Sequence, residues 1–422
     1  MSHTGRFATA IRDDARRDIE QLGKADIVVG IPAYNSDESL AYVIRTVAEG
    51  LDHFYPEKRS LIIVADGGST DDTREVALSV ESHNFNIQIL VTIYRGIPGK
   101  GSAFRAIFEA AKYLQVTALA LFDSDLKSIK PGWVHNIIEP LEEGYDFVAP
   151  DYARYKFDAT ITNTIAYNLI RALYGVNIRQ PIGGDFGMSA QMMDHCLDQD
   201  VWDTDIAKFG IDIWLTTTAI TAGLKICQTR LGAKIHGQKD PAADLGPMFR
   251  EVVGTIFILL EKNQSFIEKV KKTVDTPIFG EVLVEEPEAF EVSPEPLVEY
   301  FHIGYRNFGP VWENILEAED FKAIKKLARS RTLKKFRLPA EVWVRIVYRY
   351  AEYFGRIERQ RFKVLDTLIP LYNAKVASLI LTMQDMDRAQ SEQFYEEQAQ
   401  VFESMRGYLI DLLKKRADEQ AL

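Results

Sequence analysis

The chain has 422 residues, a length that suits two or three domains with ample cores. Hydrophobic residues make up 46% and charged residues 26%, which excludes a disordered or collagen-like chain. The net charge of −11 argues against a general nucleic-acid or anionic-membrane binder. The two cysteines, Cys196 and Cys227, provide neither a disulfide framework nor a paired metal site, which favours a reducing cytoplasm.

Residues 1–24 carry many charges and no apolar stretch, so they predict a polar helix rather than a signal peptide. The longest apolar runs, such as 252–260, are far shorter than the roughly 18–20 residues that span a bilayer. We therefore expect a chain without a membrane span.

From residue 25 to 122, apolar strands alternate with helices. Strands are predicted at 26–31, 60–66, 86–94 and 117–122, and helices at 37–51 and 102–114. This alternation predicts a parallel, doubly wound sheet, whose ligands bind where loops leave the carboxyl ends of the strands. The polar residues expected at such ends are Asn35, Asp66, Lys100, Asp123 and Asp125.

Beyond residue 150 the pattern changes. Helices are predicted at 158–176, 209–222 and 245–266, a strand at 224–231, and a Glu/Pro-rich linker or lid at 278–298. Residues 310–422 are strongly helical in pattern. We divide the chain into an N-terminal helix (1–24), an α/β domain (25–265), a linker (266–309) and a helical C-terminal domain (310–422).

The strongest local signal is Asp123-Ser124-Asp125, which directly follows a hydrophobic strand. Two carboxylates on one loop can reach a common hard cation, and Mg²⁺ or Mn²⁺ prefers such oxygen ligands together with substrate phosphates. A solvated turn or a helix cap is the alternative. The position at the end of the fourth strand favours a metal site.

Three further signals surround this loop. Gly99-Lys100-Gly101 opens a helix, and a lysine at a helix N-terminus suits a diphosphate, although an ordinary turn is the alternative. Asp66 ends a strand and can bind a base or ribose, while the residues after it cap a helix. His236 follows a strand, where its imidazole could complete a metal sphere or be structural.

A last pair of signals places small residues beside carboxylates on turns. One is Gln180-Pro-Ile-Gly-Gly-Asp185, and the other is Phe209-Gly-Ile-Asp212. A turn with a helix cap is an equally simple interpretation of both.

Taken in this order, the motifs resemble the GT-A glycosyltransferases. More narrowly, they resemble the retaining synthases that make mannosylglycerate, glucosylglycerate and glucosyl-3-phosphoglycerate. The matching stretches lie at 32–35, 66–73, 98–101, 123–126, 180–185, 209–212 and 232–236. The resemblance implies a mixed sheet flanked by helices, a mainly α-helical C-terminal region, and a helical contact that makes a homodimer.

The resemblance also implies a role for each matching position. Catalytic roles fall to Asp185, Asp212 and Lys100. The nucleotide sugar, either UDP-glucose or GDP-mannose or GDP-glucose, is expected on Pro32, Ala33, Tyr34, Asn35, Glu38, Asp66, Lys100, Asp123, Ser124, Gly183 and Gly184. The small carboxylate acceptor is expected on Arg154, Thr160 and Asp212. Mg²⁺ or Mn²⁺ is expected on Asp123, Asp125 and His236.

Two departures leave the donor and acceptor open. The family turn usually ends in Glu where this chain has Asp185, and the mannosylglycerate enzymes carry Trp where it has Phe209. Residues 153–160 also lack the Gly-rich loop that the phosphoglycerate enzymes use for the acceptor phosphate, which favours glycerate over 3-phosphoglycerate. An inverting GT-A transferase, a nucleotidyltransferase and a non-catalytic sugar-nucleotide-binding protein are also compatible with parts of this pattern.

Overall fold

The computed structural model describes residues 8–235, 245–281, 287, 289–330, 332–357 and 359–421. It divides into two compact units. The sheet unit comprises the described residues of 1–153, 178–238 and 276–287, and the helical unit those of 154–177, 239–275 and 288–422. Each unit is therefore built from several segments of the chain. The domains predicted from the sequence are consecutive stretches instead, and their boundaries stay a prediction.

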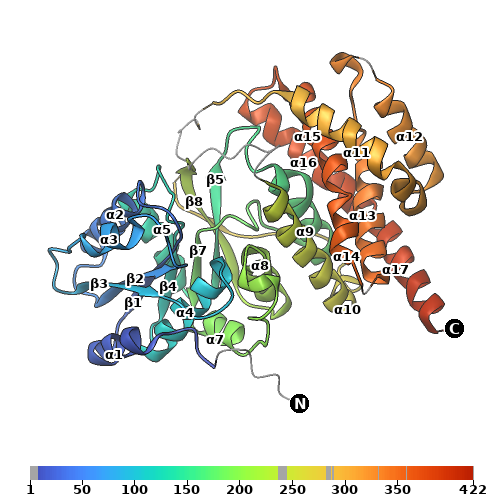
Figure 1. The fold of residues 1–422 in the computed structure, drawn as a ribbon. Coiled ribbons are helices and arrows are strands. Elements are labelled where there is room, and N and C mark those ends of the chain that lie inside the picture. Colours follow the sequence, from blue (N-terminus) through green and yellow to red (C-terminus); the bar gives the residue numbers. More distant parts are fainter. Residues whose placement is uncertain are drawn as a thin grey trace. The chain divides into compact units, whose positions relative to one another are not determined.

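The sheet unit is built on eight described strands in the order β10-β8-β5-β7-β4-β1-β2-β3 (Figure 1). Their bounds are β1 (Ile27–Ala33), β2 (Ser60–Asp66), β3 (Ile87–Ile93), β4 (Ala118–Leu121), β5 (Phe147–Ala153), β7 (Phe186–Ser189), β8 (Ile226–Ala233) and β10 (Ile278–Phe279). Strands β1 to β4 pair in parallel, which confirms the predicted doubly wound half. Strand β7 is antiparallel to β4 and β5, so the sheet is mixed, as the resemblance implied.

Helices cover both faces of this sheet. Their bounds are α1 (Asp13–Leu22), α2 (Leu40–Phe54), α3 (Thr73–Leu78), α4 (Lys100–Tyr113), α5 (Pro131–Glu142), α7 (Ala190–Leu197), the 3₁₀ turn η3 (Asp205–Ala207) and α8 (Ile211–Thr221). Helices α2 and α5 pack on one face over alternate residues of β1, among them Ile27, Val29 and Ile31. Helix α4 packs on the other face, where a Cβ at Gly30 would lie 2.6 Å from Ile107 Cγ2.

The strand order places a ligand site at one edge. Strand β1 pairs with β2 on one side and with β4 on the other, so successive connections leave β1 in opposite directions. In open α/β sheets, ligands bind at the carboxyl ends of the strands that flank such a reversal. Because β7 is antiparallel, its first residue also lies at this edge, which brings residues 183–185 to the site.

The helical unit holds the remaining elements. Their bounds are the π-helical stretches η1 (Thr162–Ala166) and η2 (Ile170–Tyr174), α6 (Tyr167–Leu169), β6 (Val176–Asn177), α9 (Leu245–Lys262), α10 (Gln264–Ile267), β9 (Val274–Asp275), α11 (Pro294–Ile315), α12 (Ala318–Ala328), η4 (Leu333–Lys335), α13 (Ala340–Arg356), α14 (Arg361–Asp366), α15 (Ile369–Met383), α16 (Arg388–Ser404) and α17 (Arg406–Ala421). The helical C-terminal region is confirmed, and α11 begins inside the predicted linker.

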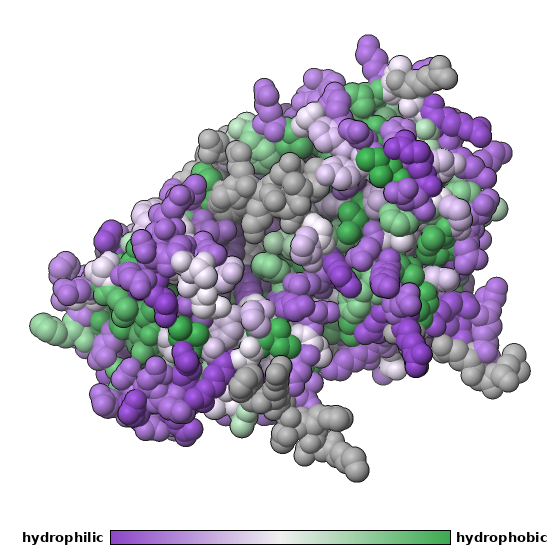
Figure 2. Space-filling view, in the orientation of Figure 1, coloured by the Kyte–Doolittle hydropathy of each residue, from purple (hydrophilic) through white to green (hydrophobic). Residues whose placement is uncertain are grey.

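One segment of this unit, Arg361–Met383, is long and apolar enough to cross a membrane. However, 78% of its most apolar window is buried inside the protein, as in the core helix of a globular domain. The face drawn in Figure 2 carries hydrophilic residues interspersed with small hydrophobic groups rather than one continuous apolar band. Within the described residues, this segment therefore fits a core helix better than a membrane span.

Candidate active site

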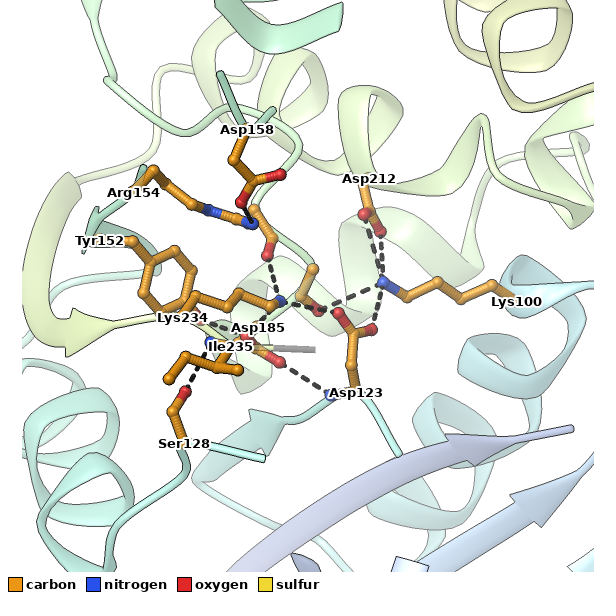
Figure 3. Close-up of polar contacts among 12 residues, drawn as sticks. Lys100, Asp123, Ser128, Tyr152, Arg154, Asp158, Asp185, Asp212, Lys234 and Ile235 are labelled. Atoms are coloured by element: carbon orange, nitrogen blue, oxygen red, sulfur yellow. Dashed lines mark hydrogen bonds and ion pairs between the residues drawn. The ribbon is translucent and has the colours of Figure 1, made fainter. Parts of the chain in front are cut away.

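Lys100 joins two carboxylates at the carboxyl edge of the sheet (Figure 3). It opens α4, and its Nζ lies 2.7 Å from Asp123 Oδ1 and 3.2 Å from both oxygens of Asp212. The Lys100 and Asp212 side chains are 11% and 13% exposed. Asp212 Oδ1 is buried and takes no hydrogen bond from any described residue. This oxygen is therefore ion-paired with Lys100 but accepts no described hydrogen bond.

Lys234, one residue beyond β8, holds the other side of the same loop. Its Nζ donates to Asp123 Oδ2 at 2.9 Å, to Asp185 Oδ2 at 2.7 Å and to the Gly183 carbonyl at 2.9 Å. Asp185 also accepts the Tyr152 hydroxyl on Oδ2 and the Asp123 backbone N–H on Oδ1, at 2.7 Å. Both oxygens of Asp185 are therefore bonded to protein groups.

Burial and charge act against each other on these groups. Burial lowers the pKa of the Lys100 ammonium, but Asp123 and Asp212 outweigh it and raise that pKa above its ordinary value. Burial raises the pKa of the Asp123 carboxyl, but Lys100 and Lys234 outweigh it and lower that pKa. Asp185 and Asp212 have raised pKa values, because burial exceeds the attraction of the lysines. The cluster thus centres on one strongly ionised carboxylate, Asp123.

Glycines let the backbone come close at this site. Gly184 has φ +91°, and a Cβ there would lie 2.2 Å from Asp123 Oδ2. A Cβ at Gly183 would lie 2.2 Å from Pro150 Cγ. The glycines around Lys100 serve a different contact from the expected diphosphate, since a Cβ at Gly101 would lie 1.9 Å from the Ile206 carbonyl oxygen. All three positions require glycine for packing within the protein.

The ends of β1 and β2 form a second part of the edge. Ala33 pairs with Asp66, and Asn35 (φ +47°) accepts the Thr70 backbone N–H on Oδ1 at 3.0 Å. Asp66 is fully buried and accepts the backbone N–H groups of Gly68 and Ser69, so its carboxylate first orders its own loop. The Tyr34 ring beside this loop is 62% exposed and offers a flat face to solvent.

The remaining predicted residues of the sheet unit lie around these two groups. Pro32 is in β1, and Glu38 is exposed on the loop before α2. Ser124 Oγ lies 2.9 Å from Ser36 Oγ, which links the Asp123 loop to the end of β1. Asp125 is half-buried and has no ion pair or hydrogen bond with a described residue. His236, the third predicted metal ligand, lies outside the described residues.

The two residues predicted for the acceptor alone belong to the helical unit. Arg154 directly follows β5, and its Nη1 donates to Asp158 Oδ2 at 2.7 Å. Thr160 is buried, and its hydroxyl is hydrogen-bonded to that of Tyr372. Their role in acceptor binding stays a prediction.

Lys234 and Tyr152 are two residues of the site that the sequence pattern did not predict. Both lie at the carboxyl ends of strands, where Lys234 N is 3.4 Å from the Ala153 carbonyl and Tyr152 pairs with Gly232 across β5 and β8. The sequence does contain a signal for such residues, namely a polar residue that directly follows a run of apolar strand residues. This signal identified Asp123. In residues 232–236 it was applied to His236, the more distinctive residue, and not to Lys234.

Residues 28–193 match the family model described as Glycosyl transferase family 2, and the mixed sheet flanked by helices agrees with a GT-A glycosyltransferase. The enzyme class and the GT-A fold expected from the motifs are thereby confirmed.

Relatives of known name are similar to this chain at low identity. A glucosyl-3-phosphoglycerate synthase of Mycolicibacterium paratuberculosis is 26% identical over 249 residues, which are 54% of this chain and 71% of that protein. Glycosyltransferase AglJ of Haloferax volcanii is 26% identical over 233 residues, 52% of this chain and 69% of that protein.

Solved structures of similar proteins give the same picture of low identity. Glucosyl-3-phosphoglycerate synthase from Mycobacterium tuberculosis, in complex with Mn²⁺, UDP and glucosyl-3-phosphoglycerate, is 21% identical with a TM-score of 0.43. The comparison covers 64% of this chain and 94% of that one.

Proposed function

We propose that this glycosyltransferase moves a hexose from a nucleotide-diphosphate sugar to a small carboxylate acceptor such as D-glycerate, with retention at the anomeric carbon. The observation that carries the proposal is the Lys100–Asp123–Asp212 cluster at the switch point of the sheet. It combines a largely enclosed cation, which suits a diphosphate, with an Asp212 oxygen that is ion-paired with Lys100 but accepts no described hydrogen bond, and so suits a sugar hydroxyl.

A divalent cation fits the donor atoms of the Asp123–Asp125 loop. The Asp125 carboxylate has no described protein partner, and Mg²⁺ or Mn²⁺ typically needs only one or two carboxylates beside substrate phosphates and water. Within the described ranges no three acidic, histidine or cysteine side chains gather as a metal site, and His236, the proposed third ligand, lies outside those ranges. A bound cation would neutralise charge on the leaving diphosphate.

The residues of this chain then divide the work. Tyr34, Asn35 and the loop after Asp66 hold the nucleoside, with Tyr34 offering a ring face to the base. Lys100 contacts the diphosphate and stabilises the negative charge that develops as the sugar leaves. Its side chain is only 11% exposed, so little water screens this attraction.

Two residues are proposed to recognise the acceptor. Arg154 would bind the acceptor carboxylate. Asp212 would orient a hydroxyl through Oδ1, which accepts no described hydrogen bond. Asp185 has both oxygens bonded within the protein, so it is poorly placed to act as a general base. This arrangement favours same-face attack, in which the leaving diphosphate takes the acceptor proton, and hence retention.

A second acceptor, 3-phosphoglycerate, is favoured by the names of the relatives. The segment 153–160 of this chain lacks glycine, which favours glycerate. A cytoplasmic location and a homodimer formed through the helical unit are further parts of the proposal. Light scattering on the purified chain tests the dimer.

A thermal-shift panel tests the donor site first. UDP, GDP and their glucose and mannose conjugates are compared with and without Mn²⁺. A cation-dependent rise in Tm with one nucleotide family supports the proposal, because ligands that bind the folded state stabilise it. The supporting nucleotide sugar is then incubated with glycerate or 3-phosphoglycerate, and NMR of the product gives the anomer. An unshifted Tm with every nucleotide at millimolar concentration contradicts a transferase, and a β product from an α donor contradicts retention.

A further inference from the structure

Lys234 is the most enclosed cation of the described sheet unit's candidate site, and neither the motifs nor the relatives assign it a role. Its side chain is 3% exposed, against 11% for Lys100. Its Nζ donates to acceptors on two separate segments: one on the loop after β4 and two on the turn before β7 (Figure 3). An ammonium has three donors, so it can donate to all three of these described acceptors.

We infer that Lys234 is a positioning residue that holds Asp123 ready for the donor diphosphate and its cation, and that Asp185 serves the same purpose rather than contacting the sugar. The inference rests on the proposed function. It names what keeps the donor site in shape before any ligand arrives.

The first support is geometric. Asp123 has its backbone N–H bonded to Asp185 Oδ1 at 2.7 Å and its carboxylate bonded to Lys234 at 2.9 Å. Asp185 is in turn bonded to Lys234 at 2.7 Å. Asp123, Asp185 and Lys234 are therefore linked to one another by three contacts. Both the backbone and the side chain of Asp123 are therefore fixed from the same two partners.

The second support is that Tyr152 anchors these three contacts. Tyr152, in β5, donates its hydroxyl to Asp185 Oδ2, and its ring lies against Trp133 with centroids 5.5 Å apart. The Lys234 ammonium also lies 5.1 Å from the centroid of the Tyr152 ring. Tyr152 lies in β5, Asp185 directly precedes β7, Lys234 directly follows β8 and Asp123 lies beyond β4. These contacts therefore tie the four strands together at their site edge.

The third support is charge. Three carboxylates, Asp123, Asp185 and Asp212, share two ammonium groups, and of these five groups Asp185 and Lys234 are buried. Lys100 faces Asp123 and Asp212, so Lys234 is the cation that balances Asp185. Without it, two carboxylates would face each other across the turn, and a buried pair that loses one partner is strongly destabilised. The Asp123 loop would then move away from the position that the donor requires.

The test compares Lys234→Met with Lys375→Met, a matched removal of a buried lysine. Lys375 lies in α15 of the helical unit, is 3% exposed and donates to Gln398 Oε1 at 2.7 Å. Calorimetric titration with Mn²⁺ and the nucleotide that wild type binds gives Kd, and donor kinetics give KM and kcat. We expect Lys234→Met to raise Kd and donor KM more than tenfold, with acceptor KM within twofold. Lys375→Met should leave all three within twofold.

A conservative variant and a milder one separate positioning from folding. Lys234→Arg keeps a cation and should recover most of the lost affinity. Tyr152→Phe keeps the ring but removes one bond to Asp185, and should raise Kd about threefold to tenfold. If Lys234→Met does not fold, the Kd of Tyr152→Phe tests the positioning role instead. A merely structural role would lower Tm and the active fraction but leave Kd and KM of the folded protein unchanged.

Two different failures are distinguishable. If wild type binds nucleotide and both Lys234→Met and Tyr152→Phe bind it equally well, the positioning role is wrong while the proposed function stands. If wild type itself binds no nucleotide, the proposed function is wrong and the inference falls with it.

Discussion

Gly184 lies so close to Asp123 that a side chain cannot be added there: a Cβ at position 184 would lie 2.2 Å from Asp123 Oδ2 and 3.1 Å from Lys234 Nζ. The glycine also has φ +91°, a conformation that L residues with a side chain rarely adopt. The Gly-Gly-Asp turn is therefore shaped around the Asp123 carboxylate.

Gly184→Ala should lower the activity by more than the strain of its backbone conformation alone would. We expect kcat/KM to fall at least tenfold, because the new methyl displaces the Asp123 carboxylate. The control is Gly144→Ala, which has φ +89° but no atom within 4 Å of its added Cβ. That variant should lose only about 1–2 kcal/mol of stability from the strained backbone and keep full activity. Equal activity loss in both variants would show that strain alone is responsible.

Gly101→Ala should destabilise the sheet unit. Gly101 is the second residue of α4, and a Cβ there would lie 1.9 Å from the Ile206 carbonyl oxygen. Gly132 is the second residue of α5 and has no atom within 4 Å of such a Cβ. Differential scanning calorimetry should therefore give a lower Tm for Gly101→Ala. For Gly132→Ala it should give an equal or higher Tm, since alanine favours helix by up to about 1 kcal/mol. A rise in both would contradict the close approach of α4 to residues 206–208.

Asp212→Asn tests whether the Asp212 carboxylate takes part in the reaction. The change keeps the shape of the side chain but removes the charge that faces Lys100 and halves the acceptor atoms. We expect kcat/KM to fall by about 10²–10³-fold, the range for loss of one preorganised electrostatic contact. Asp194→Asn removes a half-exposed carboxylate that pairs with Lys112 at 2.7 Å, and it should change kcat/KM less than twofold. Activity of Asp212→Asn within twofold of wild type would exclude Asp212 from the reaction.

The sheet and its polar edge were predictable because their signals are local. Buried runs such as Leu61–Ala65 predict a strand from a few neighbouring residues, and Asp66 and Asp123 mark where two such runs end. The parallel arrangement then follows from the alternation with helices. Local pattern was therefore sufficient for β1 to β4 and for the position of the Asp123 loop.

The bond between Lys234 and Asp123 was not predictable in this way. It joins residues 111 positions apart, and it exists because β7 enters the sheet antiparallel between β4 and β5. That insertion carries Asp185 to the same edge, where it accepts from both partners. A sequence pattern gives the ends of strands but not their order across the sheet, so the partners of a buried lysine remain unknown until the order is known.

Lys375 gives the helical unit a stability that depends on pH. Burial lowers the pKa of its ammonium from 10.5 to about 7, opposed only partly by Glu341 of α13. The unfolded chain thus binds one proton more than the folded chain between pH 7 and about 10, so folded stability rises with pH through this window. The slope is at most about 1.4 kcal/mol per pH unit, and below pH 7 the contribution is flat.

Lys375→Met removes the buried charge and should raise Tm below pH 7, where the ammonium is most costly. The gap in Tm between variant and wild type should narrow as the pH rises from 7 to 9, because the wild-type lysine is then neutral in the folded state. Scanning calorimetry across this range measures the gap, with the exposed Lys363→Met as the control that should give parallel curves. A gap for Lys375→Met that stays constant with pH would mean that this lysine keeps its proton in the folded protein, with Gln398 and water sustaining the charge.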